Sequence, residues 1–244
     1  MNERILENLN EILQRIETAC VKSQRNPKDV RLLLATKTVT AENIKIALQS
    51  GQTLIGENKV QEVKDKYEDL KVMPHEKHFI GHLQTNKIKD ILKYDVSCIQ
   101  SLDRLDLAQK LHQRLSFEKK TIDVFIQVNT SNEDSKFGVR PGYTLELVKQ
   151  VSELDTLQIK GLMTIGLFSA ETEKVRGCFK LLKTLQQQIV AENILNVSVN
   201  ELSMGMSGDL ETAIEEGATI VRVGTAIFGQ RIYSDSYYWN ENVT

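Results

Sequence analysis

Lys37 is the first residue whose position in this sequence suggests chemistry, because it directly follows an almost uninterrupted apolar run at residues 31–36. A short run without alternating polar residues is typical of a buried strand in a parallel sheet. Its end would emerge at the carboxyl edge of that sheet, where α/β folds place their ligands, and partial burial there lowers the pKa of an amine. Lys37 could then form a Schiff base with an aldehyde. The alternative is a structural lysine whose charged end extends into water.

Gly224 and Thr225 follow the last apolar run, within the segment Arg-Val-Gly-Thr-Ala-Ile-Phe-Gly at residues 222–229. Glycine lets the backbone approach a ligand closely, and threonine adds a hydroxyl. A short helical turn that begins here would direct amide N–H groups outward. This composition suits a phosphate, although glycine and threonine at a strand end also form ordinary turns.

Ser207 lies in a second loop of small residues, Ser-Met-Gly-Met-Ser-Gly-Asp at residues 203–209. Its hydroxyl could cap the helix that is predicted to follow, or it could hold an anion together with its own amide. If this loop and the loop at 222–229 leave neighbouring strands, their hydroxyls converge on one site. The agreement between the two loops favours a phosphate site over two unrelated turns.

Arg222 interrupts the apolar segment at residues 219–223, and a buried guanidinium needs a partner. A carboxylate is one candidate. A ring nitrogen is another, because arginine is always protonated and would hold a pyridine nitrogen unprotonated. A ring held in this way is a poor electron sink. Asn58, after the second apolar run, could hydrogen-bond a phenolic oxygen or cap a helix.

The composition is that of an ordinary globular protein, with 244 residues, 41% hydrophobic and 26% charged residues and a net charge of −2. This balance provides no overall field that would recruit nucleic acid or an anionic membrane. The cysteines are far apart and form no CxxC pair, so neither disulfides nor a metal site are predicted. The first residues lack a signal-peptide pattern and no stretch could span a bilayer, so we expect a cytoplasmic protein.

The first two dozen residues are predicted to form an amphipathic helix, because apolar residues recur there every three or four positions. After it, short apolar runs alternate with amphipathic stretches. The predicted strands lie at residues 31–36, 53–55, 77–80, 96–100, 121–128, 157–163, 197–202 and 219–223. The predicted helices between them lie at residues 41–49, 59–70, 85–92, 104–116, 143–151, 172–191 and 208–216.

About eight strand–helix units of this size predict an α/β protein whose parallel strands close into a single (β/α)₈ TIM-like barrel. A doubly wound open sheet is the main alternative. No linker-like segment divides the chain, so one barrel domain is predicted over residues 1–244. The amino-terminal helix is extra to the barrel, and we expect it to pack across the barrel's bottom.

Several motifs match one known family, in order along the chain. They include Ala-Thr-Lys at 35–37, Ile-Gly-Glu-Asn at 55–58, His-Phe-Ile-Gly-His-Leu-Gln at 78–84, Ser-Met-Gly-Met-Ser at 203–207 and Arg-x-Gly-Thr-x-Ile-Phe-Gly at 222–229. Together they resemble the pyridoxal phosphate homeostasis protein family. The similarity covers nearly the whole chain, and the last two motifs are highly specific.

The resemblance implies a protein that binds pyridoxal 5′-phosphate (PLP) and keeps vitamin B6 pools balanced, without an established catalytic reaction. It also implies a barrel similar to the N-terminal domain of alanine racemase. Lys37 would hold PLP as an internal aldimine, from which PLP could pass to apoenzymes. The other implied contacts are Ser207, Gly224 and Thr225 with the phosphate, Arg222 with the pyridine nitrogen, and Asn58 and Met204 with the ring.

Lys59 departs from the family pattern, which often has tyrosine after Gly-Glu-Asn. If its side chain lines the entrance, it changes the polarity of the pocket. The departure leaves Lys37 in place, so the implied binding of PLP is unaffected.

A PLP-dependent amino-acid racemase is the alternative function. It needs the same lysine and phosphate site, and also a second acid or base on the other face of the cofactor, which alanine racemase takes from a separate domain. Here the predicted barrel is followed by a short tail with Tyr233, Tyr237, Tyr238 and Trp239. We therefore expect a monomeric PLP carrier rather than an enzyme.

Overall fold

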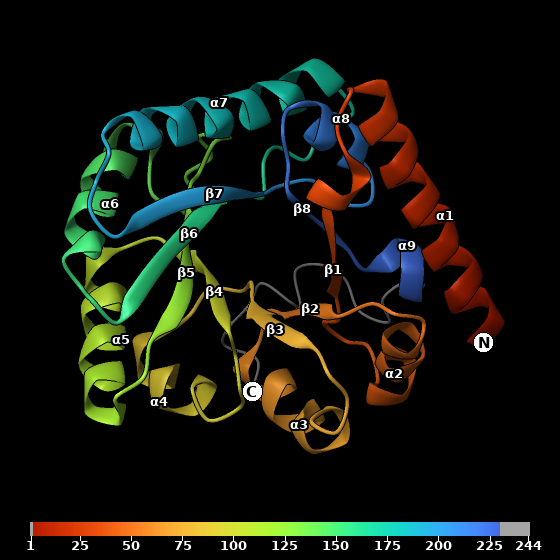
Figure 1. Ribbon diagram of the computed structural model, residues 1–244, viewed down its shortest axis with the longest axis horizontal. Helices are drawn as coiled ribbons and strands as arrows, with labels where there is room; N and C mark the ends of the chain where they lie inside the picture. The colour runs from red at the N-terminus through yellow and green to blue at the C-terminus, as the bar shows by residue number, and fades with distance from the viewer. Residues whose placement is uncertain (1, 230–244) are drawn as a thin grey trace.

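Eight parallel strands close into a barrel in this computed structural model, which describes residues 2–229 (Figure 1). The strands follow one another around the barrel in chain order, and β1 pairs with β8. Their bounds are β1 Arg31–Ala35, β2 Leu54–Glu57, β3 Glu76–Phe79, β4 Cys98–Leu102, β5 Ile122–Gln127, β6 Leu157–Met163, β7 Val197–Ser203 and β8 Ile220–Val223. The predicted α/β barrel is confirmed, and the pairing of β1 with β8 excludes the open sheet.

Helices surround the barrel and connect its strands. They are α1 (Asn2–Lys22), α2 (Ala41–Gln49), α3 (Val60–Leu70), α4 (Ile88–Ile91), α5 (Leu105–Glu118), α6 (Thr144–Ser152), α7 (Thr172–Ala191), α8 (Leu210–Glu215) and α9 (Thr225–Phe228). Most elements begin and end within two residues of their predicted bounds. The segment predicted at 85–92 divides into a 3₁₀ turn, Thr85–Lys87, and the short helix α4.

Alternate residues of each strand point into the barrel or out towards the helices. Leu33 of β1 and Phe125 of β5 belong to an apolar cluster inside the barrel. Leu34 belongs to the larger core that the barrel shares with the helices. Polar side chains of the strands, including Gln100, Ser203 and Arg222, are also buried.

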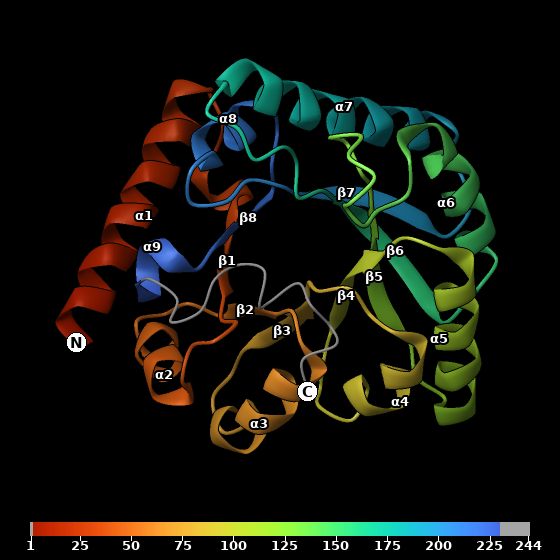
Figure 2. The ribbon, with the colours of Figure 1, turned by 180° about the vertical axis from the view of Figure 1, so that it is seen from behind.

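The amino-terminal helix α1 lies along the side of the barrel, next to α8 and α9 (Figures 1 and 2). The expectation that it packs across the bottom is therefore wrong. Its buried stripe includes Ile5, Leu9, Ile12 and Ile16. Because α8 and α9 contain only six and four residues, they leave part of the outer face around β8 and β1 for α1 to cover.

Residues 2–229 contain no helix with the length and apolarity that crossing a bilayer requires. The same residues form one barrel. The prediction of a single domain over 1–244 extends beyond them and stays a prediction.

Candidate functional site

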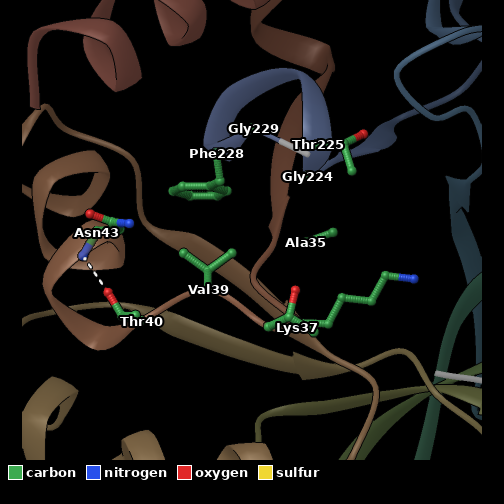
Figure 3. Close-up of a pocket in the computed structure, with 10 residues that line it drawn as sticks. Ala35, Lys37, Val39, Thr40, Asn43, Gly224, Thr225, Phe228 and Gly229 are labelled. Atoms are coloured by element: carbon green, nitrogen blue, oxygen red, sulfur yellow. Dashed lines mark hydrogen bonds between the residues drawn. The ribbon is translucent and has the colours of Figure 1, made fainter. Parts of the chain in front are cut away.

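A cavity of about 190 Å³ opens where β1 and β8 end, at the carboxyl edge of the barrel (Figure 3). Closure of the barrel places these two strands side by side, with Leu34 opposite Val223. Lys37, Gly224 and Thr225 all line the cavity. The structure therefore brings together three of the predicted site residues, which come from opposite ends of the chain.

The ends of β1 and β8 approach each other so closely at residue 224 that only glycine fits there. A Cβ atom at this position would lie 2.7 Å from the carbonyl oxygen of Ala35 and 3.3 Å from its Cβ. A backbone oxygen of a strand cannot move away without separating β1 from β8. The glycine thus keeps the wall of the cavity free of a side chain beside Lys37.

The segment that carries Lys37 is held on both sides by α3. Lys66 donates to the carbonyl oxygen of Thr36, with 2.8 Å from Nζ to O. Glu62 accepts a hydrogen bond from the backbone N–H of Thr38, with 2.6 Å from N to Oε2. Thr38 has a φ of 65°, a left-handed conformation that is unfavourable for a β-branched residue. The two bonds support this turn and set the direction in which Lys37 leaves the strand.

Glu57 and Glu62 share the ammonium of Lys66, each with an oxygen 2.8 Å from Nζ. Glu57 is buried and also accepts a hydrogen bond from Thr36 Oγ1 at 2.6 Å, while its Oε2 has no partner among residues 2–229. Burial raises the pKa of Glu57 to about 7, although the charge of Lys66 opposes this.

The pKa of Lys66 is also raised, because the two carboxylates outweigh the lowering effect of burial. One ammonium between two carboxylates leaves excess negative charge in a poorly solvated place. The more buried carboxyl, Glu57, is the group that relieves it by taking up a proton near neutral pH. The support of the Lys37 segment is therefore electrostatic and sensitive to pH.

Arg222 is buried inside the barrel and is held by neutral acceptors. Its Nη1 donates to Ser203 Oγ at 2.8 Å, and its Nη2 donates to the backbone oxygen of Thr164 at 2.7 Å. Burial lowers the pKa of Arg222 to about 10, and the charge of Asp209 opposes that effect. The guanidinium therefore stays protonated at neutral pH.

A directed chain of hydrogen bonds leads from Arg222 across the barrel interior. Because arginine can only donate hydrogen bonds, Ser203 Oγ accepts one from Arg222. The Ser203 hydroxyl then donates a hydrogen bond to Gln100 Oε1, 2.6 Å away. Gln100 then directs its Nε2 at Nδ1 of His78, 2.7 Å away, which must be the unprotonated ring nitrogen. The other ring nitrogen of His78 lies 3.7 Å from the carboxylate of Glu76. A charge on β8 thus orders side chains on β7, β4 and β3.

Replacing Gln100 with methionine is expected to lower the free energy of unfolding by about 1–3 kcal/mol, because Ser203 and His78 each lose a buried partner. Urea denaturation measures this. Gln113→Met is the matched control, because Gln113 is exposed on α5, and its effect should stay within about 0.5 kcal/mol. Equal effects of the two substitutions would contradict the directed chain.

Asn58, Ser207 and Met204 are not among the residues that line the cavity within the described part of the chain. The Oδ1 atom of Asn58 is buried without a hydrogen-bond partner among residues 2–229. Ser207 precedes α8, but Asp209 is the N-cap residue and accepts from the backbone N–H of Met206 at 2.5 Å, so the capping hypothesis for Ser207 is wrong. Met204 is fully buried in the core shared by barrel and helices.

Lys66, Glu62 and Gln100 were missing from the residues predicted from the sequence. Glu62 and Lys66 are four residues apart on one helix, which is also the pattern of an ordinary exposed ion pair. Their contacts with the Lys37 segment depend on how α3 packs over β1. For Gln100 a signal was present, because a glutamine in a fully buried strand needs polar partners.

The chain matches the family model of the alanine racemase N-terminal domain over residues 7–232. It is 44% identical to the pyridoxal phosphate homeostasis protein of Aquifex aeolicus over 227 residues, which cover 93% of this chain and 98% of that protein. It is 38% identical to the protein of the same name from Escherichia coli K12 over 237 residues, which cover 96% of this chain and 99% of that protein.

Solved structures show the same relationship. An unknown protein from Bifidobacterium adolescentis has a TM-score of 0.88 at 37% identity and covers 93% of this chain and 95% of its own. PipY of Synechococcus elongatus, solved with PLP bound, has a TM-score of 0.77 at 30% identity and covers 89% of this chain and 100% of its own. Alanine racemase of Clostridium difficile, at 12% identity and a TM-score of 0.77, shares the fold alone, and this chain spans 58% of it. The chain belongs to the pyridoxal phosphate homeostasis protein family, and its barrel is of the alanine racemase N-terminal type.

Proposed function

We propose that this protein binds PLP in the cavity between β1 and β8 and holds it through Nζ of Lys37. When bound, PLP supplies an aldehyde for an amine, a phosphate and an electron-accepting ring. The observation that carries the proposal is that Lys37, Gly224 and Thr225, from the two ends of the chain, line one cavity (Figure 3). The names of the relatives and the PLP bound to PipY support it.

The residues around the cavity fit this cofactor. Gly224 leaves room where any other residue would place a Cβ atom 2.7 Å from a backbone oxygen. Thr225 lines the cavity and offers a hydroxyl for a phosphate. Ser207, which is outside the lining, is partly exposed and could offer a second hydroxyl. The buried Oδ1 of Asn58, which has no partner among residues 2–229, is the kind of group that a ligand completes. A contact between Met204 and the ring stays a prediction.

We also propose that Arg222 faces the ring nitrogen of PLP. A guanidinium carries five N–H groups, and its bonds to Ser203 and Thr164 leave further donors. A fixed cation beside the nitrogen keeps a proton off it and weakens the electron sink on which most carbanion chemistry of PLP depends. This residue therefore supports a role in holding PLP rather than in catalysis.

The absorption spectrum of the purified protein with PLP tests the proposal. Attachment to a lysine gives a near-visible band, and borohydride should remove this band and fix the cofactor to one peptide. We expect that peptide to contain Lys37. A spectrum identical to that of PLP in buffer, or fixation to another lysine, would contradict the proposal.

Measuring the turnover of L-amino acids distinguishes a PLP carrier from a racemase. We propose that PLP is released to PLP-dependent apoenzymes, so activation of an added apoenzyme is expected to accompany loss of the band. Incubation with L-amino acids and chiral analysis should find no product, and turnover above about one per second would establish an enzyme. The tyrosines considered as a second base, Tyr233, Tyr237 and Tyr238, lie outside the described residues.

We further propose a monomer that functions in the cytoplasm. Cys20, Cys98 and Cys178 are buried, and none forms a disulfide in the described part of the chain, which suits a reducing compartment. Sedimentation of the purified protein checks the monomer.

A further inference from the structure

Two loops contribute to the proposed phosphate site, and both are tied to α1, a helix outside the barrel. The phosphate loops are residues 203–209 and 222–229. Asn8 donates from Nδ2 to the backbone oxygen of Ile227 at 3.0 Å, across 219 residues of sequence. Arg15 donates from Nη2 to the backbone oxygen of Ser207 at 2.9 Å, across 192 residues.

Arg15 is itself held in place by a two-pronged ion pair. Its Nε lies 2.7 Å from Oε1 of Glu211, and its Nη2 lies 2.9 Å from Oε2 of the same carboxylate. Paired bonds of this kind fix the plane of a guanidinium as well as its distance. Because Glu211 is in the first turn of α8, Arg15 joins α1 to both the loop at Ser207 and the helix that follows it.

The spacing of Asn8 and Arg15 on α1 fixes the distance between their two contacts. Asn8 and Arg15 are seven residues apart, which is about two turns or roughly 10 Å along the helix, and they lie on the same side. The neighbouring stripe of Leu9, Ile12 and Ile16 is buried in the core that the barrel shares with the helices, and it holds α1 in position. A rigid helix thus sets the distance between two separate loops.

The loops need this support because the helices after them are short. α9 contains four residues and α8 contains six, and helices of this length are not stable without tertiary contacts. The carbonyl of Ile227 is in the last turn of α9, where backbone oxygens lack partners within the helix. Asn8 supplies a partner for it.

We propose that Asn8 and Arg15 are positioning residues for the phosphate of PLP, and that α1 sets the separation of the two phosphate loops. The inference rests on the proposed function of the site. It adds that phosphate recognition, and not the reaction of the aldehyde with Lys37, depends on a helix that does not line the cavity.

The test compares two ligands that differ in the phosphate alone. Asn8→Ala and Arg15→Met are combined in the full-length, cofactor-free protein, and PLP and pyridoxal are titrated by absorbance. The double variant is expected to bind PLP about tenfold more weakly while its affinity for pyridoxal is unchanged. Inorganic phosphate should also compete with PLP less well. Asn10→Ala with Arg4→Met is the matched control, because both residues are exposed on the same helix.

Two results would overturn the inference. An equal loss for PLP and pyridoxal would show a general structural effect, and unchanged affinity for both would show that α1 has no part in phosphate binding. If the double variant unfolds, Arg15→Lys replaces it, because lysine keeps the charge near Glu211 but lacks the planar fork. Failure of the wild-type protein to give the near-visible band would instead contradict the proposed function.

Discussion

Replacing Lys37 with methionine is expected to abolish the near-visible band that PLP gives with the wild-type protein. Methionine has a similar length but no amine, so no bond to the aldehyde can form. Gly224 and Thr225 remain, and PLP should still bind weakly through its phosphate. The absorbance titration and borohydride fixation measure both effects. The free energy of unfolding should change by less than about 1 kcal/mol, because Lys37 is half-buried at a strand end.

Lys59→Met is the control for this experiment. Lys59 is the N-cap residue of α3 and follows Asn58, so it is a second lysine close in sequence to the proposed site. The band should survive its replacement. If the band persists in Lys37→Met and disappears in Lys59→Met, PLP is attached to Lys59, and the proposed attachment to Lys37 is wrong.

The barrel could be predicted because its elements are specified locally. Residues 157–163 form a strand and residues 172–191 a helix in the structure with the predicted bounds, since apolar periodicity and length decide both. The place of α1 could not be predicted in this way. An amphipathic helix requires an apolar surface, but the short lengths of α8 and α9, which leave such a surface on the side, are known only from the structure.

The candidate site could be predicted where each residue type indicates its own chemistry. Lys37, Gly224 and Thr225 are of this kind, and they line one cavity. The supporting residues are different, because their meaning comes from their partners. Lys66 is an ordinary helix lysine until α3 packs over β1 and directs its Nζ at the oxygen of Thr36.

Replacing Lys66 with methionine is expected to lower the free energy of unfolding by about 3–5 kcal/mol at pH 9. Lys66 is the only cation that forms an ion pair with both Glu57 and Glu62 among residues 2–229, and the substitution removes it. Glu57 is then buried without a counter-charge, and Thr36 loses the donor to its oxygen. Urea denaturation at several pH values measures the loss.

The loss should shrink as the pH falls. Glu57 has a pKa of about 7 in the folded protein, above its ordinary value of 4.5, so the folded state binds more protons than the unfolded state between these values. This contribution to stability is complete below about 4.5 and disappears as the pH rises through 7. Without Lys66 the pKa of Glu57 rises further. The variant therefore gains more stability on acidification than the wild-type protein does.

Lys45→Met separates the effect of a buried cluster from that of any lost ion pair. Lys45 pairs with Asp69 at 3.5 Å near the surface, and such pairs contribute about 0–1 kcal/mol. Its loss should be small and should not vary in the same way with pH. If Lys66→Met costs the same at pH 5 and pH 9, the cause is packing of the lysine stem and not charge. If the pH dependence appears, weaker binding of PLP should accompany it, because the Lys66 and Glu62 bonds flank Lys37.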